Sequence, residues 1–319
     1  MKKTLIALAA VAATGAAFAQ SSVTLYGVAD AALVKTTGKS AILSSSGGMN
    51  NGTSRWGMRG SEDLGGGLKA GFNYEAGLSL NDGSTGQSGG QYFSRGAWMN
   101  LSGGFGELRL GRTLNPSFYA AAAWELTGTA NYSVAVGQHG AVLGGIRNSS
   151  QIAYTTPTMG GFSATLGYIM KGNNVVGGSA ATATTPAVAG VEKAKVDLNA
   201  IYRNGPVAVA LGYNKVQDAE KNVHIGANYK VGPVAIAGSI VDPAGDAKGF
   251  TIGAGMQAGP VYLVLDIARD THFKDTNVLV EAKYPLSKRT FAYAAFVRDG
   301  DGKTATSSNN LGLGLRHNF

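Results

Sequence analysis

The sequence has no cysteine, only eight prolines and, beyond its N-terminus, no long apolar run. The absence of cysteine excludes a disulfide framework, on which many small exported domains depend. A membrane-spanning helix needs roughly 20 consecutive apolar residues, and no stretch after the N-terminal segment approaches that length. Lys and Arg are dispersed along the chain without a basic tail, so we predict no nucleic-acid partner.

Glycine is the residue that the chain has in excess. It accounts for 48 of 319 residues, about 15% against a usual ~7%. The glycines follow no collagen period. A chain of this length could form two ordinary domains or one large β domain, since barrels often exceed ~200 residues. The composition favours the single β domain.

The first nineteen residues have the three parts of a secretory signal peptide. Lys2-Lys3 form a positive start, Leu5–Ala13 an apolar core too short to span a bilayer, and Ala17–Ala19 a small-residue cleavage site. We predict that residues 1–19 are removed and that residues 20–319 form the mature protein. Removing two of the 27 basic residues leaves 25 against 19 acidic ones, a net charge of +6.

Most of the mature chain alternates apolar and polar residues with a period of two, as half-buried β-strands do. A clear example sets Val223, Ile225, Ala227 and Tyr229 against Asn222, His224, Asn228 and Lys230. The tripeptide Gly-Pro-Val recurs at residues 205, 232 and 259, a spacing of 27, each time between two alternating segments. A repeat of strand, tight turn, strand and longer loop is typical of an up-and-down barrel. The chain offers sixteen candidate strands, an even number that places both termini at the rim with short turns.

The apolar faces of these strands could contact a protein core or lipid, and three features favour lipid. The polar faces carry both signs of charge, tyrosines recur at strand ends as in an interfacial girdle, and sixteen strands enclose water rather than a packed core. Unpaired backbone groups are costly in hydrocarbon, so the first and last strands must pair. We therefore predict an all-β fold, a sixteen-stranded antiparallel transmembrane β-barrel.

One segment, from Gly111 to Ser149, breaks this rhythm. It carries few charges, shows neither strand nor helical alternation, and contains Glu125 as its only acid. Compact domains seldom tolerate a loop longer than ~12–15 residues unless it is functional. We therefore expect this segment to have a functional role.

Four parts of the sequence resemble a known family: Ser22–Gly27, Ser54–Ala70, Leu108–Arg112 and the terminal Phe319. They resemble the general-diffusion porins of Gram-negative bacteria, and most of all the betaproteobacterial branch, over the whole mature chain. The resemblance implies a homotrimer in the cell outer membrane, in contact with lipid and lipopolysaccharide. It also implies an infolded third external loop, about residues 113–147, as the constriction, and recognition of Phe319 by the barrel-assembly machinery.

In the resembled family, arginines on the barrel wall face acids on the infolded loop, and the field in this aqueous throat selects ions. Arg55 and Arg95 match wall positions, and Arg59 shares a strand face with Arg55. The other candidates for the pore constriction are Arg112, Arg147, the loop acid Glu125, and His139, which stands where some members place a further arginine. We expect a water-filled channel for passive diffusion of small hydrophilic solutes and ions, modestly selective for anions.

Three alternative functions were compared with the channel. A barrel enzyme needs a nucleophile, a base and an orienting group within hydrogen-bond reach. The histidines, His139, His224, His272 and His317, fall on separate segments, and the sequence has no metal-spaced cluster, phosphate loop or dinucleotide motif, so we predict no catalysis, metal or cofactor. A substrate-specific channel with a saturable site is a closer alternative, because Tyr119, Trp124 and Tyr132 lie in the inner loop. A secreted β adhesin is the third.

Overall fold

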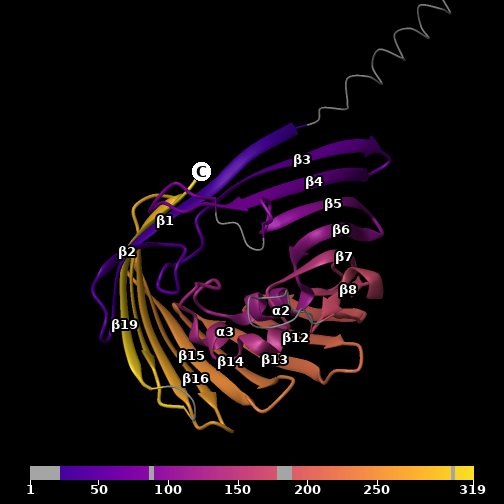
Figure 1. Ribbon diagram of the computed structural model, residues 1–319. Coiled ribbons are helices and arrows are strands. Elements are labelled where there is room, and N and C mark those ends of the chain that lie inside the picture. Colours follow the sequence, from indigo (N-terminus) through magenta and orange to yellow (C-terminus); the bar gives the residue numbers. More distant parts are fainter. Residues whose placement is uncertain (1–21, 86–89, 178–188, 303–305) are drawn as a thin grey trace, which may run out of the picture.

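The computed structural model describes residues 22–85, 90–177, 189–302 and 306–319, which form a closed β-barrel (Figure 1). The predicted signal peptide lies outside the described residues. Seventeen strands form the wall sheet. They are β1 (Ser22–Thr36), β2 (Ile42–Ser45), β3 (Arg55–Gly65), β4 (Leu68–Gly77), β5 (Gly96–Gly103), β6 (Gly106–Leu114), β7 (Arg147–Thr155), β8 (Phe162–Ile169), β11 (Lys195–Asn204), β12 (Val207–Val216), β13 (Lys221–Val231), β14 (Val234–Asp242), β15 (Gly249–Ala258), β16 (Val261–Asp270), β17 (Thr276–Pro285), β18 (Thr290–Asp299) and β19 (Ser308–Asn318).

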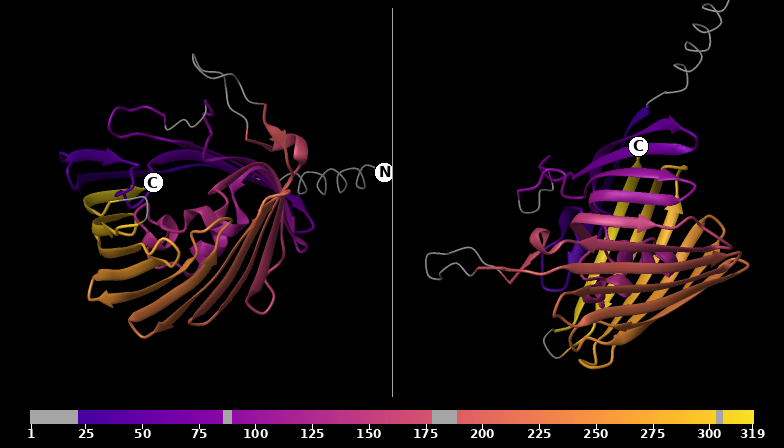
Figure 2. Two further views of the ribbon diagram at one scale, coloured as in Figure 1. Left: turned by 60° about the horizontal axis from the view of Figure 1, so that its bottom comes forward. Right: turned by 90° about the vertical axis from the view of Figure 1, so that its right-hand side faces the viewer.

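The strands β2 and β3 share one position in the wall. β2 pairs with Ala31–Val34 of β1, and β3 pairs with Ser22–Val28 of the same strand. The described chain thus has 17 − 1 = 16 wall positions, which confirms the predicted sixteen-stranded antiparallel barrel. A separate ladder of β9 (Val175–Val176) and β10 (Val191–Glu192), with the 3-10 helix η2 (Lys171–Asn173), projects from one end of the barrel (Figure 2).

The barrel closes where the two ends of the chain meet. β1 pairs with β19 from Val28–Asn318 to Thr36–Asn310. One residue further on, Gly27 N donates to Phe319 O at 2.9 Å and Phe319 N donates to Gly27 O at 3.0 Å. Closure of this kind satisfies backbone groups that would otherwise be unpaired in hydrocarbon.

The recurring Gly-Pro-Val sequences form the predicted tight turns. β11 ends at Asn204 and β12 begins at Val207, so only Gly205 and Pro206 lie between them. Gly205, Gly232 and Gly259 have φ values of 54°, 57° and 58°, respectively. A two-residue hairpin turn requires such a positive φ at its first position, which glycine adopts at low cost.

The apolar strand faces point outward, as predicted. In β16, Leu263 and Leu265 are 36% and 48% exposed, whereas Val264 and Asp266 between them are 2% and 3% exposed. An exposed apolar band around a closed barrel fits lipid surroundings, because water would disfavour it.

The segment between β6 and β7 carries three short helices, which lie inside the ring of strands (Figure 1). They are α2 (Pro116–Trp124), α3 (Val134–Gly137) and the 3-10 helix η1 (Gly140–Leu143). The side chain of Asn115 caps α2 by accepting from Phe118 N at 2.8 Å, and Pro116 occupies the first turn. No helix in the described residues is long and apolar enough to cross a membrane.

Buried contacts fix this segment against the strands β11 to β13. The carboxylate of Asp197 accepts from Ser117 N at 2.8 Å and from Ser117 Oγ at 2.7 Å. Lys195 Nζ donates to Gly144 O at 2.6 Å, near the other end of the segment. The Trp124 ring covers Gly226 of β13 so closely that a Cβ there would overlap it. These contacts attach the segment between β6 and β7, which we call the inner segment, to β11 and β13.

Candidate functional site

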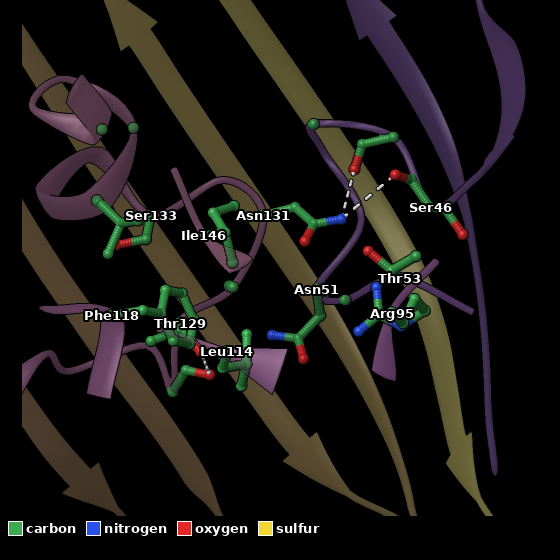
Figure 3. Close-up of a pocket in the computed structure, with 18 of the residues that line it drawn as sticks. Ser46, Asn51, Thr53, Arg95, Leu114, Phe118, Thr129, Asn131, Ser133 and Ile146 are labelled. Atoms are coloured by element: carbon green, nitrogen blue, oxygen red, sulfur yellow. Dashed lines mark hydrogen bonds between the residues drawn. The ribbon is translucent and has the colours of Figure 1, made fainter. Parts of the chain in front are cut away.

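Four arginines from separate wall positions line one cavity of about 580 Å³ beside the inner segment. They are Arg55 in β3, Arg95 just before β5, Arg147 at the start of β7 and Arg316 in β19. Figure 3 shows this cavity with Arg95 on the wall side and Thr129, Asn131 and Ser133 on the inner segment. Among the described residues that line it, none carries a carboxylate.

Glu75 of β4 is the acid that contacts this cluster. Its Oε1 lies 2.8 Å from Arg95 Nε and its Oε2 lies 3.6 Å from Arg55 Nε. Tyr26 also donates its hydroxyl to Oε2 at 3.0 Å, which fixes the carboxylate. Glu75 therefore neutralises part of the charge while it holds two of the arginines in place.

The remaining two arginines have neutral partners. Arg147 Nε donates to the Arg95 backbone carbonyl at 2.7 Å, and Arg316 Nη1 donates to Asn51 Oδ1 at 2.8 Å. Guanidinium groups stay protonated in proteins. Four arginines and one glutamate give the cluster a net charge of 4 − 1 = +3.

Arg59 and Arg112 lie outside this cavity. Arg59 lies nearer the short turns, with its guanidinium 5.2 Å from the centre of the Tyr26 ring. It lines a smaller cavity of about 260 Å³. Arg112 donates to Ser94 O at 2.5 Å and to Ser149 Oγ at 2.6 Å, so it braces the wall beside the cluster.

Glu125 does not face the arginines across the lumen as expected. Only 8% of it is exposed. Its carboxylate accepts from Ser133 Oγ at 2.7 Å, from Thr129 N at 2.6 Å and from the Thr127 hydroxyl. The carboxylate binds donors of its own segment, because the turn after α2 leaves these groups without strand partners. Glu125 thus stabilises the turn after α2 by accepting hydrogen bonds within the inner segment.

His139 also lies away from the cluster. It is 1% exposed and packs against Gly249 of β15, on the opposite part of the wall. Burial disfavours the imidazolium form and lowers the pKa of His139 below its ordinary value of 6.5. His139, a candidate for the constriction, does not line the arginine cavity.

Two further acids lie on the wall behind the inner segment. Asp266 and Glu281 are 3% and 0% exposed. Lys283 Nζ lies 3.0 Å from Glu281 Oε1 and donates to Thr127 O at 2.6 Å. Neither acid lines the arginine cavity, and Glu281 forms an ion pair with Lys283.

Arg316 is a member of the cluster that was not predicted from the sequence. It follows Leu311, Leu313 and Leu315 on the opposite strand face, so the alternation placed it toward the lumen. Its depth in the barrel depends on the register between β19 and β1, where Arg316 pairs with Asp30. That register is a property of the closed barrel.

Sequence comparison provides the family. The family model of the Gram-negative porins matches residues 4–305. The chain belongs to the Gram-negative porin family. This porin is therefore an outer-membrane protein, and the resemblance seen in its motifs is confirmed. A secreted soluble adhesin does not agree with this family.

The relatives of this porin include two curated outer-membrane porins. It is 42% identical over 221 residues to outer membrane porin protein 32 of Delftia acidovorans, a match that covers 66% of this chain and 59% of that relative. It is 34% identical over 240 residues to an outer membrane porin protein of Bordetella pertussis, a match that covers 68% of this chain and 60% of that relative. The match thus spans 59–60% of the length of these relatives.

Solved structures agree with the barrel. The anion-selective porin from Comamonas acidovorans has a TM-score of 0.74 and 28% identity, covering 94% of this chain and 100% of that one. An outer-membrane protein of Vibrio cholerae, OmpT, has a TM-score of 0.66 at 15% identity over 94% of this chain and 98% of that one, which shows the fold alone.

Proposed function

We propose that this porin forms a water-filled channel through which small hydrophilic solutes and ions diffuse passively, with a modest preference for anions. The observation that carries the proposal is the cavity lined by four arginines, of which only two contact the carboxylate of Glu75. A net positive field in a narrow aqueous passage lowers the barrier for anions and raises it for cations. The solved relative from Comamonas acidovorans, whose name calls it anion-selective, supports this preference.

Reconstitution into planar bilayers under a KCl gradient tests the proposal. We expect open channels whose zero-current potential has the sign that chloride permeation produces. A potential of the cation sign would contradict the anion preference. A folded, inserted protein that conducts no ions would contradict the channel itself.

A substrate-specific channel with a saturable site is the second candidate, and two of its three supporting residues are buried. Trp124 and Tyr132 are 3% and 4% exposed, whereas Tyr119 is 37% exposed. Stacking a solute requires an accessible ring face, so Tyr119 alone of the three offers one. A saturable block of the ion conductance by one sugar or organic acid would favour this candidate, provided that Tyr119→Ala removes the block.

The family also supports proposals about export and assembly. We propose that residues 1–19 are removed, that Phe319 is read by the barrel-assembly machinery, and that the mature chain forms a homotrimer in contact with outer-membrane lipid and lipopolysaccharide. Family and fold indicate a channel, and we propose no catalytic activity. N-terminal sequencing of the mature protein and cross-linking in outer-membrane vesicles test the cleavage site and the trimer.

A further inference from the structure

The connection between β2 and β3, residues 46–54, also turns into the barrel. We call it the inner first loop. Met49, Asn50 and Asn51 at its centre are 8%, 0% and 5% exposed. A loop at a barrel rim is ordinarily solvated, so the burial of three consecutive residues shows that this one has a defined inward position.

Asp30 of β1 anchors the inner first loop. Its carboxylate accepts from Asn50 Nδ2 at 2.9 Å, from Gly52 N at 2.9 Å and from the Tyr293 hydroxyl at 2.6 Å. Asp30 is 0% exposed. A buried carboxylate with several donors holds them firmly, because releasing any donor leaves charge unsatisfied.

The inner first loop meets the segment between β6 and β7 through a set of hydrogen bonds that we call the clasp. Asn131 Nδ2 donates to Gly47 O at 3.0 Å and to Ser46 O at 3.4 Å, contacts that Figure 3 shows as dashed lines. Asn131 N donates to Asn51 O at 3.3 Å, and Asn51 Nδ2 donates to the Tyr132 hydroxyl at 2.8 Å. The two loops are far apart in the sequence, and the clasp joins them inside the lumen.

The clasp stands between two cavities of similar size. The arginine cavity has a volume of about 580 Å³, and a second cavity of about 610 Å³ lies on the other side of Gly47, Gly48 and Asn131, which line both. Among the described residues of the second cavity there is no arginine or lysine, and Asp299 is its acid. The two cavities therefore offer an ion opposite environments.

Two mainly apolar side chains, one from each loop, line the second cavity. Met49 of the inner first loop and Tyr132 of the inner segment both line it, and both belong to a buried cluster with Val134, Tyr293 and Val297. Met49 and Tyr132 therefore pack the two loops together beside this cavity. Separating the loops would withdraw both side chains from this shared cluster.

We propose that the clasp is a second determinant of the constriction: it closes the side of the lumen that lacks arginines and confines solutes to the arginine-lined side. This inference rests on the proposed channel function and deepens it. Asn131 and Tyr132 are positioning residues, since they carry no charge and act by holding the inner first loop across the lumen. Ion preference would then depend on a neutral contact as well as on the arginines.

The double substitution Asn131→Ala with Tyr132→Phe removes the side-chain bonds of the clasp from the inner segment without changing any charge. The two cavities have similar volumes, so we expect their merging to raise single-channel conductance up to about twofold and to move the zero-current potential toward zero. The matched control is Asn204→Ala with Tyr202→Phe, an exposed Asn–Tyr hydrogen bond of 3.1 Å near a short turn. The control should keep wild-type values.

A reversible variant keeps the test decisive if the double substitution impairs folding. The chain has no native cysteine, so Gly48→Cys with Asn131→Cys can be joined by a short thiol cross-linker and released by a reductant. A Cβ at Gly48 meets nothing within 4 Å. We expect wild-type conductance when cross-linked and a reversible increase, with weaker anion preference, after reduction.

The outcomes separate the two proposals. An anion-selective wild type whose conductance and zero-current potential are unchanged by both variants overturns the clasp inference alone. A wild type that conducts nothing, or prefers cations, overturns the proposed function before the clasp is tested. Increased conductance with unchanged ion preference would contradict the confining role of the clasp.

Discussion

At the scale of single residues, the arginines differ in their position in the lumen. Arg147 lines the arginine cavity and has a neutral hydrogen-bond partner, whereas Arg59 lines a different cavity. Both are lumen-facing and carry the same charge. Local field strength falls with distance and with screening by salt, so their contributions to selectivity should differ.

We predict that Arg147→Gln lowers the chloride-to-potassium permeability ratio more than Arg59→Gln. A unit charge at ~4 Å in water is worth ~1 kcal/mol, so we expect a roughly twofold to fivefold fall for Arg147→Gln. Zero-current potentials at low and moderate KCl measure the ratio. An equal or larger effect of Arg59→Gln would place the constriction nearer the short turns than the arginine cavity.

His139 gives a prediction about pH. Burial lowers the pKa of His139 below 6.5, so the folded protein holds it neutral where the unfolded chain takes up a proton. Its contribution to stability is therefore complete above pH 6.5 and is lost as the pH falls toward the folded pKa, by at most ~1.4 kcal/mol per pH unit. Asp270 is the nearby acid that opposes the shift.

Thermal unfolding in detergent at pH 7.5 and 5.5 checks this expectation, with the pH values chosen to lie on either side of His139's ordinary pKa of 6.5. The wild type should lose more stability between the two than His139→Gln, which cannot take up a proton. If both proteins lose the same amount, other groups account for the pH dependence.

At the scale of elements, α2 depends on a glycine in the wall. A Cβ at Gly226 would overlap the Trp124 ring. Gly226→Ala should therefore push α2 away from β13 toward the lumen. Overpacking of this kind costs ~1–3 kcal/mol, and we expect lower single-channel conductance with a lower unfolding temperature. Gly172→Ala, where a Cβ meets nothing within 4 Å, is the control and should change neither.

The inner segment shows which structural features the alternation of residues can predict. The break in strand alternation predicts a segment from Gly111 to Ser149. In the structure β6 ends at Leu114 and β7 begins at Arg147. The helix α2 could not be predicted from alternation, because Pro116–Trp124 is apolar nearly all round and packs against the wall. The position of Glu125 could not be predicted either, because it depends on the turn that its neighbours form.

At the scale of the whole molecule, Phe319 takes part in closing the barrel. Its backbone exchanges two hydrogen bonds with Gly27, and its ring fills the space that a Cβ on Gly27 would need. The residue therefore contributes to closure besides its expected role as an assembly signal. The two roles predict different effects of substitution.

We predict that Phe319→Ala reduces the amount of folded, heat-modifiable barrel in the outer membrane severalfold, while refolding of the purified chain in detergent is affected less. The substitution keeps the backbone hydrogen bonds and removes only the ring. Gel mobility before and after heating measures both amounts. Equal losses in cells and in detergent would show that the ring acts through stability rather than through recognition.

The sequence by itself determined the class of this protein. Period-two alternation, the Gly-Pro-Val repeat and the need to pair every backbone group fix a closed barrel with lipid outside, because these constraints act along each strand and between neighbours. The motifs fixed the family. The family resemblance also gave Arg55, Arg95 and Arg147 as candidates for the constriction, and these three line the arginine cavity.

Only the tertiary structure decided which of the side chains meet. Arg316 joins the cluster through the pairing of β19 with β1, and Glu125 leaves it because its segment supplies nearer donors. The inner first loop faces the lumen because Asp30, a buried acid in another strand, binds it. Such contacts join residues distant in the sequence, and strand register and loop packing, which no local pattern encodes, bring them together.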